Sequence, residues 1–206
     1  LVRNLKSTNK VFKDMHIKSI EPLLQHYGIQ TTWLDLVDNI WIALWFSCYK
    51  AVSSGKDGKY LNFERRSERK ENKTQRYAYI ILVAADLSSA KVISPGIWKG
   101  INTELIDLRL AAPSIFLRPH AQHGLLFRNL GKPSGRDSDY SSSIAGIVRV
   151  DLADALDWLG NGNLLDTHSL FPPASYDSGY EILLEIRDSL IKENKISMGN
   201  INYIGT

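Results

Sequence analysis

The first clear pattern of apolar residues in this chain has the period of a helix. Apolar side chains recur after Ser19, a candidate N-cap, at the spacing expected for one helical face. These positions are Ile20, Leu23, Leu24 and Tyr27. Gly28 follows them directly and is typical of a residue that ends a helix. We therefore expect a short helix before Gly28, and extended or irregular chain over residues 29–34.

A second helix is expected in the most apolar segment, which begins at Ile40 and runs to Ala51. Its side chains leave little polar surface, which predicts that the helix is buried. Asp38 or Asn39 is placed to cap its first turn, and the Ser-Ser-Gly sequence at residues 53–55 is expected to stop it. The polar residues just before this helix are therefore expected to be anchored to the core.

Residues 56–76 combine many charged side chains of both signs with few apolar ones. This pattern predicts a charged surface loop between core elements. A solvated loop explains the mixture of signs better than a nucleic-acid contact, which would favour basic residues alone.

Strands are expected in the middle of the chain. Residues 77–83 are continuously apolar, which predicts a central strand buried on both faces. Shorter strands are expected over residues 102–108, 115–117, 125–127 and 144–150. Asp151 is placed to cap a helix that ends at Gly160, and a last helix is expected from about Asp177. Because helices lie at both ends, we expect an α+β fold: a single domain over residues 1–206, with a mixed or antiparallel central sheet flanked by helices.

Composition narrows the class of protein. The chain has 206 residues, 44% hydrophobic and 23% charged, which suits one globular domain. It has no apolar run near the roughly 18 residues that a membrane span needs, so we expect a soluble, cytoplasmic protein with no membrane partner. The net charge of +3 does not require a nucleic-acid partner. The single cysteine, Cys48, excludes an internal disulfide and fits a reducing compartment.

Known phosphate-binding, zinc-binding and nucleophile-elbow motifs do not occur in the chain. Candidate chemistry lies instead in two polar clusters, at residues 25–35 and 118–124. In the first cluster, His26 suits a general acid or base or a contact to a ribose hydroxyl, although taken alone it better suits a helix-end histidine bonded to backbone. Thr31 suits a phosphate or sugar contact or a local bond. Asp35 suits a cap or a site carboxylate, and Tyr27 suits the core or a stacking contact.

In the second cluster, Arg118 offers a planar fork for a phosphate or carboxylate group, or else one half of a structural ion pair. Gln122 can both donate and accept, which suits a ribose edge, although a loop hydrogen bond explains it equally well. Gly124 permits close approach of another group. No metal site is expected from either cluster.

The residues of both clusters resemble the signatures of the FRG domain family. The first resemblance covers Gln25-His26-Tyr27-Gly28-x-x-Thr31-x-x-Leu34-Asp35, then Asn39 and Ala43-Leu44-x-Phe46. The second covers Ile106-Asp107-Leu108 and Arg118-x-x-Ala121-Gln122-x-Gly124, and a third covers Leu170-Phe171-Pro172. The chain departs from the family at Thr32, where arginine is usual, at Leu36-Val37, where Trp-Thr is usual, and at Phe127, which is a displaced aromatic. The family's Phe-Arg-Gly motif has no counterpart among residues 1–24.

The resemblance implies an ADP-ribosyltransferase-like arrangement that holds NAD. By this analogy His26 and Gln122 would be the catalytic residues, with Gln122 where the catalytic acid usually stands, and Ala43 and Phe46 would pack behind the site. The residues that would bind the cofactor are Gln25, Tyr27, Thr31, Asp35 and Arg118. Breaking the bond between nicotinamide and ribose builds positive charge on the sugar, so such a site needs an acceptor at the 2′-hydroxyl and a clamp on the pyrophosphate.

Three hypotheses for function follow. The first is a transferase effector or toxin in bacterial or phage defence, which uses NAD to modify a protein or nucleic-acid acceptor and has an immunity partner. The second is a non-catalytic module that binds a nucleotide or a partner. Val37, Gln122 and the lack of the arginine of the Phe-Arg-Gly motif favour this hypothesis. The third, a nuclease, lacks the paired carboxylates that a metal site needs.

Overall fold

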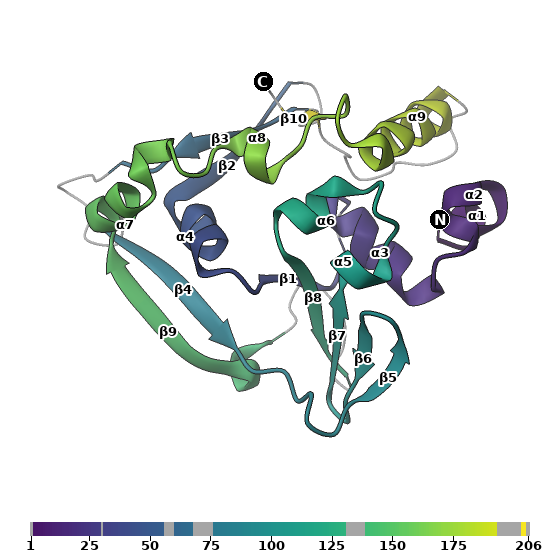
Figure 1. Ribbon diagram of the computed structural model, residues 1–206, viewed down its shortest axis with the longest axis horizontal. Helices are drawn as coiled ribbons and strands as arrows, with labels where there is room; N and C mark the ends of the chain where they lie inside the picture. Colours follow the sequence, from purple (N-terminus) through teal and green to yellow (C-terminus); the bar gives the residue numbers. More distant parts are fainter. Residues whose placement is uncertain are drawn as a thin grey trace.

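The computed structural model describes residues 2–29, 31–55, 60–67, 76–130, 139–192 and 203–204. The fold is α+β, with an antiparallel central sheet and helices packed against it (Figure 1), as the sequence pattern predicts. Among the described residues, no helix combines the length and apolar character needed to cross a membrane.

The central sheet has five strands in the order β1-β8-β7-β6-β5, and every pairing in it is antiparallel. Its strands are β1 (Leu34–Val37), β5 (Lys91–Ser94), β6 (Ile97–Lys99), β7 (Thr103–Asp107) and β8 (Gly124–Asn129). All five residues of β7 are buried, so this strand lies in the core of the sheet. The expected strands at 102–108 and 125–127 are therefore confirmed.

One hydrophobic core lies between this sheet and the helices on the right of Figure 1. These helices are α1 (Val2–Thr8), α2 (Lys10–Lys13), α3 (Ile17–His26), α5 (Leu108–Ala111), α6 (Leu117–Ala121) and α9 (Ser178–Lys192). Tyr27, Phe116 and Leu126 are fully buried in this core. Because Leu126 comes from β8, the core fixes the end of the sheet where both predicted polar clusters lie.

A second core surrounds α4 (Ile40–Cys48) on the other side of the molecule. It includes residues of β4 (Tyr77–Val83), β9 (Ile144–Asp151), α7 (Leu152–Trp158) and α8 (Thr167–Leu170). A smaller sheet of β2 (Tyr49–Ser54), β3 (Tyr60–Arg65) and β10 (Tyr203–Ile204) lies beside it. Strand β1 leads directly from the first core to α4 in the second (Figure 1).

Three helix starts test the expected caps. Asn39 caps α4 and accepts hydrogen bonds from the backbone of Trp41 and Ile42, and Asp151 caps α7, both as expected. The helix ending at residue 26 begins earlier than expected, because His16 is its N-cap. Ser19 lies inside the helix, where its hydroxyl donates to the His16 carbonyl.

The helix expected from Ile40 to Ala51 is shorter than predicted. It ends at Cys48, and the chain turns at Tyr49 into strand β2, which pairs with β3. Strand β3 lies within the segment expected to be a loop, so that prediction is wrong for residues 60–65; residues 56–59 and 68–75 lie outside the described residues. The expectation of a fully buried helix is wrong at its start, where Ile40 and Trp41 are exposed.

Two strand predictions are also wrong in part. Residues 77–83 do form β4, but among the described residues it pairs with β9 alone, and Tyr79 and Ile81 are exposed, so it is not a central strand. Residues 115–117 form no strand, because Phe116 closes a turn onto the Pro113 carbonyl and α6 begins at Leu117.

Candidate functional site

The two predicted polar clusters meet where β1 pairs with β8. The register places Asp35 opposite Leu126 and Val37 opposite Gly124. A Cβ atom on Gly124 would lie 2.3 Å from Nε2 of His26. Only a glycine lets the start of β8 pass so close to the imidazole. The glycine of one cluster is therefore packed directly on the histidine of the other.

Gln25 and Thr31 hold the irregular segment between α3 and β1. The Gln25 amide donates to Asp35 Oδ2 at 2.7 Å and to the Trp33 carbonyl at 3.1 Å. The Thr31 hydroxyl donates to Gln25 Oε1 and accepts from the Trp33 backbone at 3.2 Å. The polar groups of Gln25 and Thr31 are therefore bonded to other groups of the protein itself. The observed role of these two side chains is to shape this segment.

His26 is enclosed by protein. Its side chain is 4% exposed, and among the described residues neither ring nitrogen has a hydrogen-bond partner; the nearest carboxylate oxygen, Asp35 Oδ1, is 4.0 Å from Nε2. Burial, and then the positive charge of Arg118, lowers the pKa of His26 to about 3, an effect that the nearby Gln122 partly offsets. The ring is therefore neutral near pH 7 and shielded from solvent.

Arg118 and Tyr27 are also buried. The Arg118 guanidinium donates to the His26 carbonyl at 2.9 Å and lies over the rings of Tyr27 and Tyr180, 4.4 Å and 4.6 Å from their centroids. The Tyr27 hydroxyl donates to Oδ2 of the buried Asp177 at 2.6 Å. Burial, and then the charge of Asp177, raises the pKa of Tyr27 far above its ordinary value. Both residues hold the junction of α3, α6 and α9.

Gln122 and Asp35 face in different directions. Gln122 is 5% exposed, and its amide donates to the Leu170 carbonyl at 2.9 Å, which joins α6 to α8. The Asp35 side chain is 58% exposed. Burial by the surrounding protein raises the pKa of Asp35, and the hydrogen bond from Gln25 partly offsets this rise. Asp35 is thus the predicted site residue that is open to solvent.

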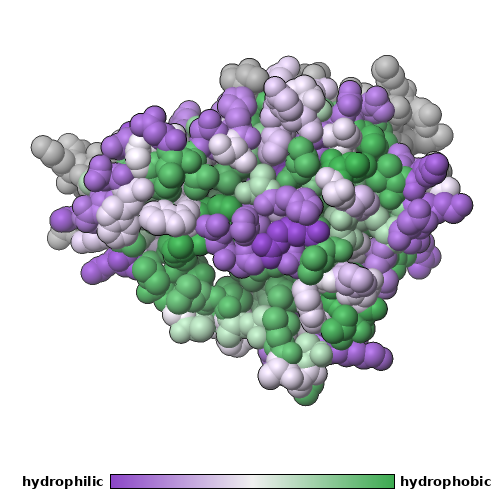
Figure 2. Space-filling view, in the orientation of Figure 1, coloured by the Kyte–Doolittle hydropathy of each residue, from purple (hydrophilic) through white to green (hydrophobic). Residues whose placement is uncertain are grey.

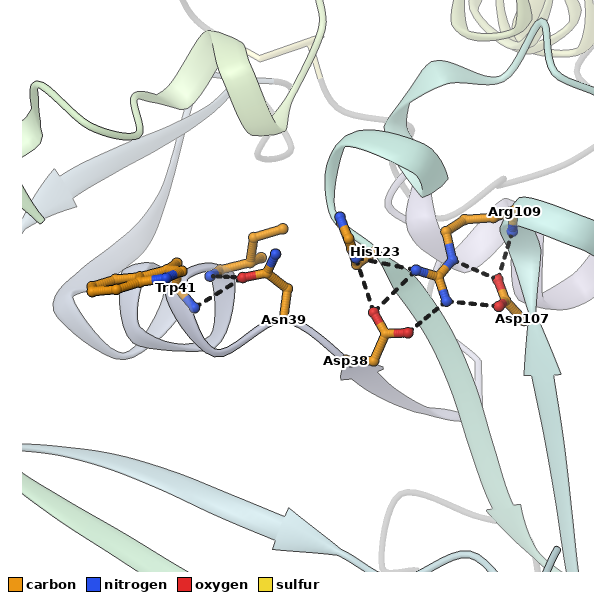
Figure 3. Close-up of polar contacts among 7 residues, drawn as sticks. Asp38, Asn39, Trp41, Asp107, Arg109 and His123 are labelled. Atoms are coloured by element: carbon orange, nitrogen blue, oxygen red, sulfur yellow. Dashed lines mark hydrogen bonds and ion pairs between the residues drawn. The ribbon is translucent and has the colours of Figure 1, made fainter.

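A charged cluster beside these residues, exposed at Asp38, partly exposed at His123 and buried at Asp107, was not predicted from the sequence (Figure 3). Arg109 donates to both oxygens of Asp38, at 3.0 Å and 2.6 Å, and to both oxygens of Asp107, at 2.9 Å and 2.7 Å. Nδ1 of His123 is 3.0 Å from Asp38 Oδ1 and 3.1 Å from Nη1 of Arg109. The sequence did hint at these residues through their positions. Asp107 lies within a segment that resembles the family, His123 lies between Gln122 and Gly124, and Asp38 directly follows the segment that forms β1.

The surroundings of Asp38 favour its ionised form. Burial raises the pKa of Asp38, but hydrogen bonds from Arg109 and His123 outweigh it, and the net pKa is lowered. The hydrogen bonds that Arg109 donates to Asp107 and then to Asp38 raise the pKa of Arg109. Because two carboxylates neutralise the positive charge of its guanidinium, Arg109 is poorly suited to bind an anionic ligand.

The cluster lies beside a hollow in the surface. Figure 2 shows this hollow between the β4–β9 ribbon and the segment joining β1 to α4, with hydrophilic residues along its upper rim and hydrophobic residues below. Asp38 and Asn39 belong to that segment, and Trp41 follows them with 47% of its surface exposed (Figure 3). Polar groups and an exposed aromatic residue therefore follow one another along the segment that enters α4.

Within the described part of the chain, no three histidine, cysteine, aspartate or glutamate residues are grouped closely enough to hold a metal ion. Comparison with known proteins finds no matching family model, no matching curated protein and no matching solved structure.

Proposed function

We propose that this chain is an FRG-type domain that binds NAD or a related nucleotide in the hollow beside α4. The observation that carries the proposal is the pairing of β1 with β8, which joins the two FRG-like blocks at one place beside that hollow. The resemblance to the FRG family suggests a nucleotide as the ligand. The exposed groups near the hollow have the chemistry to bind one.

A nucleotide presents a flat base and ribose hydroxyls. Trp41 offers an open indole ring on which a base can stack. The exposed side of Asp38 can accept a hydrogen bond from a ribose hydroxyl. In this proposal the buried His26, Arg118 and Gln122 hold the elements that form the rim, and they do not touch the ligand.

Transfer of ADP-ribose to a protein or nucleic-acid acceptor is the second candidate function. It requires a group that takes a proton from the acceptor, and the contact between Asp38 and His123 favours it. An effector role in bacterial or phage defence, with an immunity partner, belongs to this candidate.

Calorimetric titration with NAD tests the binding proposal. Trp41→Ala removes the stacking surface, and stacking of a base on an aromatic ring contributes about 1–3 kcal/mol, so we expect Kd to rise roughly tenfold or more. Trp158→Ala is the matched control, because Trp158 is similarly exposed but lies on α7. Equal Kd values for the two variants, or no NAD binding by the parent protein, would overturn the proposal.

Nicotinamide release from NAD, measured in the same samples, separates the two functions. Binding without release supports a binding module, whereas release supports the transferase. His26→Gln and Gln122→Met test the direct roles that the resemblance implies. If the ligand does not contact these residues, we expect folded forms of both variants to retain NAD binding.

A further inference from the structure

The contact between His123 and Asp38 has the geometry of an oriented imidazole. Nδ1 of His123 is 3.0 Å from Asp38 Oδ1 and 3.1 Å from Nη1 of Arg109, and within the described part of the chain the ring makes no other hydrogen bond. The side chain is 39% exposed, so solvent reaches the imidazole. An imidazole held through Nδ1 with Nε2 open is the arrangement that histidine bases use.

The position of the proton on His123 follows from its neighbours. An ionised Asp38 can only accept, so its oxygen at 3.0 Å requires a hydrogen on Nδ1. The alternative is that Nδ1 accepts from Arg109 Nη1 at 3.1 Å, which would place lone pairs of Nδ1 and Asp38 Oδ1 face to face. The first arrangement avoids that repulsion and leaves the lone pair of the neutral ring on Nε2.

The rest of the cluster fixes this pair in place. Arg109 binds both oxygens of Asp38, and Asp107 binds Arg109 from the other side, so the carboxylate has one orientation (Figure 3). His123 has a φ of 52°, in the left-handed region that side-chain-bearing residues seldom adopt. Such backbone strain is common where a side chain must point in one functional direction.

We propose that Asp38 and His123 form a proton-accepting dyad that activates the acceptor in ADP-ribosyl transfer. This proposal rests on the proposed binding of NAD beside α4. Nε2 of His123 takes the proton from an acceptor O–H or N–H group while that oxygen or nitrogen forms a bond to C1′ of the ribose. The bond between C1′ and nicotinamide breaks, and neutral nicotinamide leaves with the electron pair. Asp38 stabilises the imidazolium that results.

The proton position can be measured without any activity. Nitrogen-15 NMR of the histidine rings is expected to show the Nδ1–H form for neutral His123, the less common tautomer of free histidine. Asp38→Asn removes the carboxylate acceptor, and the Nδ1–H form is expected to lose its preference. An Nε2–H form in the parent protein would overturn the dyad, whether or not NAD binds.

Turnover tests the base itself. His123→Asn retains an N–H donor for Asp38 but has no Nε2, so we expect NAD to bind with a Kd within about twofold of the parent, while acceptor-dependent nicotinamide release falls by about 10²–10⁴-fold. Added imidazole is expected to restore part of the rate to His123→Ala. The control is His16→Asn, because His16 is the N-cap of α3 and asparagine is a good N-cap.

The outcomes separate the two proposals. If the parent protein binds and consumes NAD and His123→Asn turns over at the parent rate, the dyad is wrong and the binding proposal stands. If the parent protein binds NAD but releases no nicotinamide with protein and nucleic-acid acceptors, the dyad is also rejected. If the parent protein does not bind NAD, the binding proposal fails, and the transfer role of the dyad fails with it.

Discussion

Replacing Gly124 with alanine tests the contact that joins the two motif-like segments. The new Cβ would lie 2.3 Å from Nε2 and 2.4 Å from Cε1 of His26, whereas ordinary contacts begin at 3.4 Å. The imidazole or the start of β8 must therefore move by about 1 Å. The backbone of Gly124 does not have a positive φ, so the effect comes from lack of space and not from backbone strain.

The structure offers little room for this movement. The His26 side chain is 4% exposed, and its carbonyl is held by Arg118 at 2.9 Å. Overpacking of a well-packed core costs about 1–3 kcal/mol, and we expect Gly124→Ala near the upper end of that range. For a chain of this size the melting temperature would fall by roughly 5–10 °C.

Thermal and urea denaturation measure the change, with Gly146→Ala as the matched control. Gly146 is also in a strand, but its new Cβ would lie 3.6 Å from the Leu82 side chain, an ordinary contact. The control is expected to be neutral or stabilising by up to about 1 kcal/mol. Removing the ring in Gly124→Ala/His26→Ala should recover part of the loss, through a coupling of about 0.5–3 kcal/mol. Equal stability of the two glycine variants would refute the close contact.

Two further predictions concern the buried polar groups. Tyr27→Phe removes the hydroxyl that donates to the buried Asp177 at 2.6 Å and should cost about 1.5–3 kcal/mol in urea denaturation, whereas the exposed Tyr79→Phe should cost almost nothing. The folded-state pKa of His26, about 3, lies below its unfolded value of 6.5, so the unfolded state takes up the proton first as pH falls. The parent protein should therefore lose roughly 2–3 kcal/mol more stability between pH 7 and 4.5 than His26→Gln, and parallel pH profiles would contradict this.

Local signals in the sequence predicted the elements that local interactions determine. The caps Asn39 and Asp151 were predictable because each side chain bonds to the backbone two or three residues later. Strand β3 was missed because it lies within a highly charged segment that carries few apolar residues. The exposed face of β4 was missed because an apolar run alone does not show how many strands will pair with it.

The candidate site was predictable to the same extent. The sequence pattern predicted that the segments around His26 and Gln122 lie on one side of the same cleft. In the structure these segments are adjacent, because β1 pairs with β8. It did not predict that both side chains turn inward, because that depends on how α3 and α6 pack against the sheet. The cluster of Asp38, Arg109 and His123 forms only when three distant segments pack together: the end of β1, the end of β7 and the start of β8. No local sequence pattern predicts such long-range packing.

These orientations divide the polar residues into two groups with different roles. An inner group, His26, Arg118 and Gln122, bonds to or packs against protein and ties α3, α6 and α8 together. An outer group, Asp38 and His123, has side chains that are 44% and 39% exposed. Because His123 adjoins Gly124, which packs on His26, a change at His26 can shift His123 and lower turnover without altering NAD binding. Loss of activity in a His26 variant would therefore not identify a catalytic residue unless the position of His123 were shown to be unchanged.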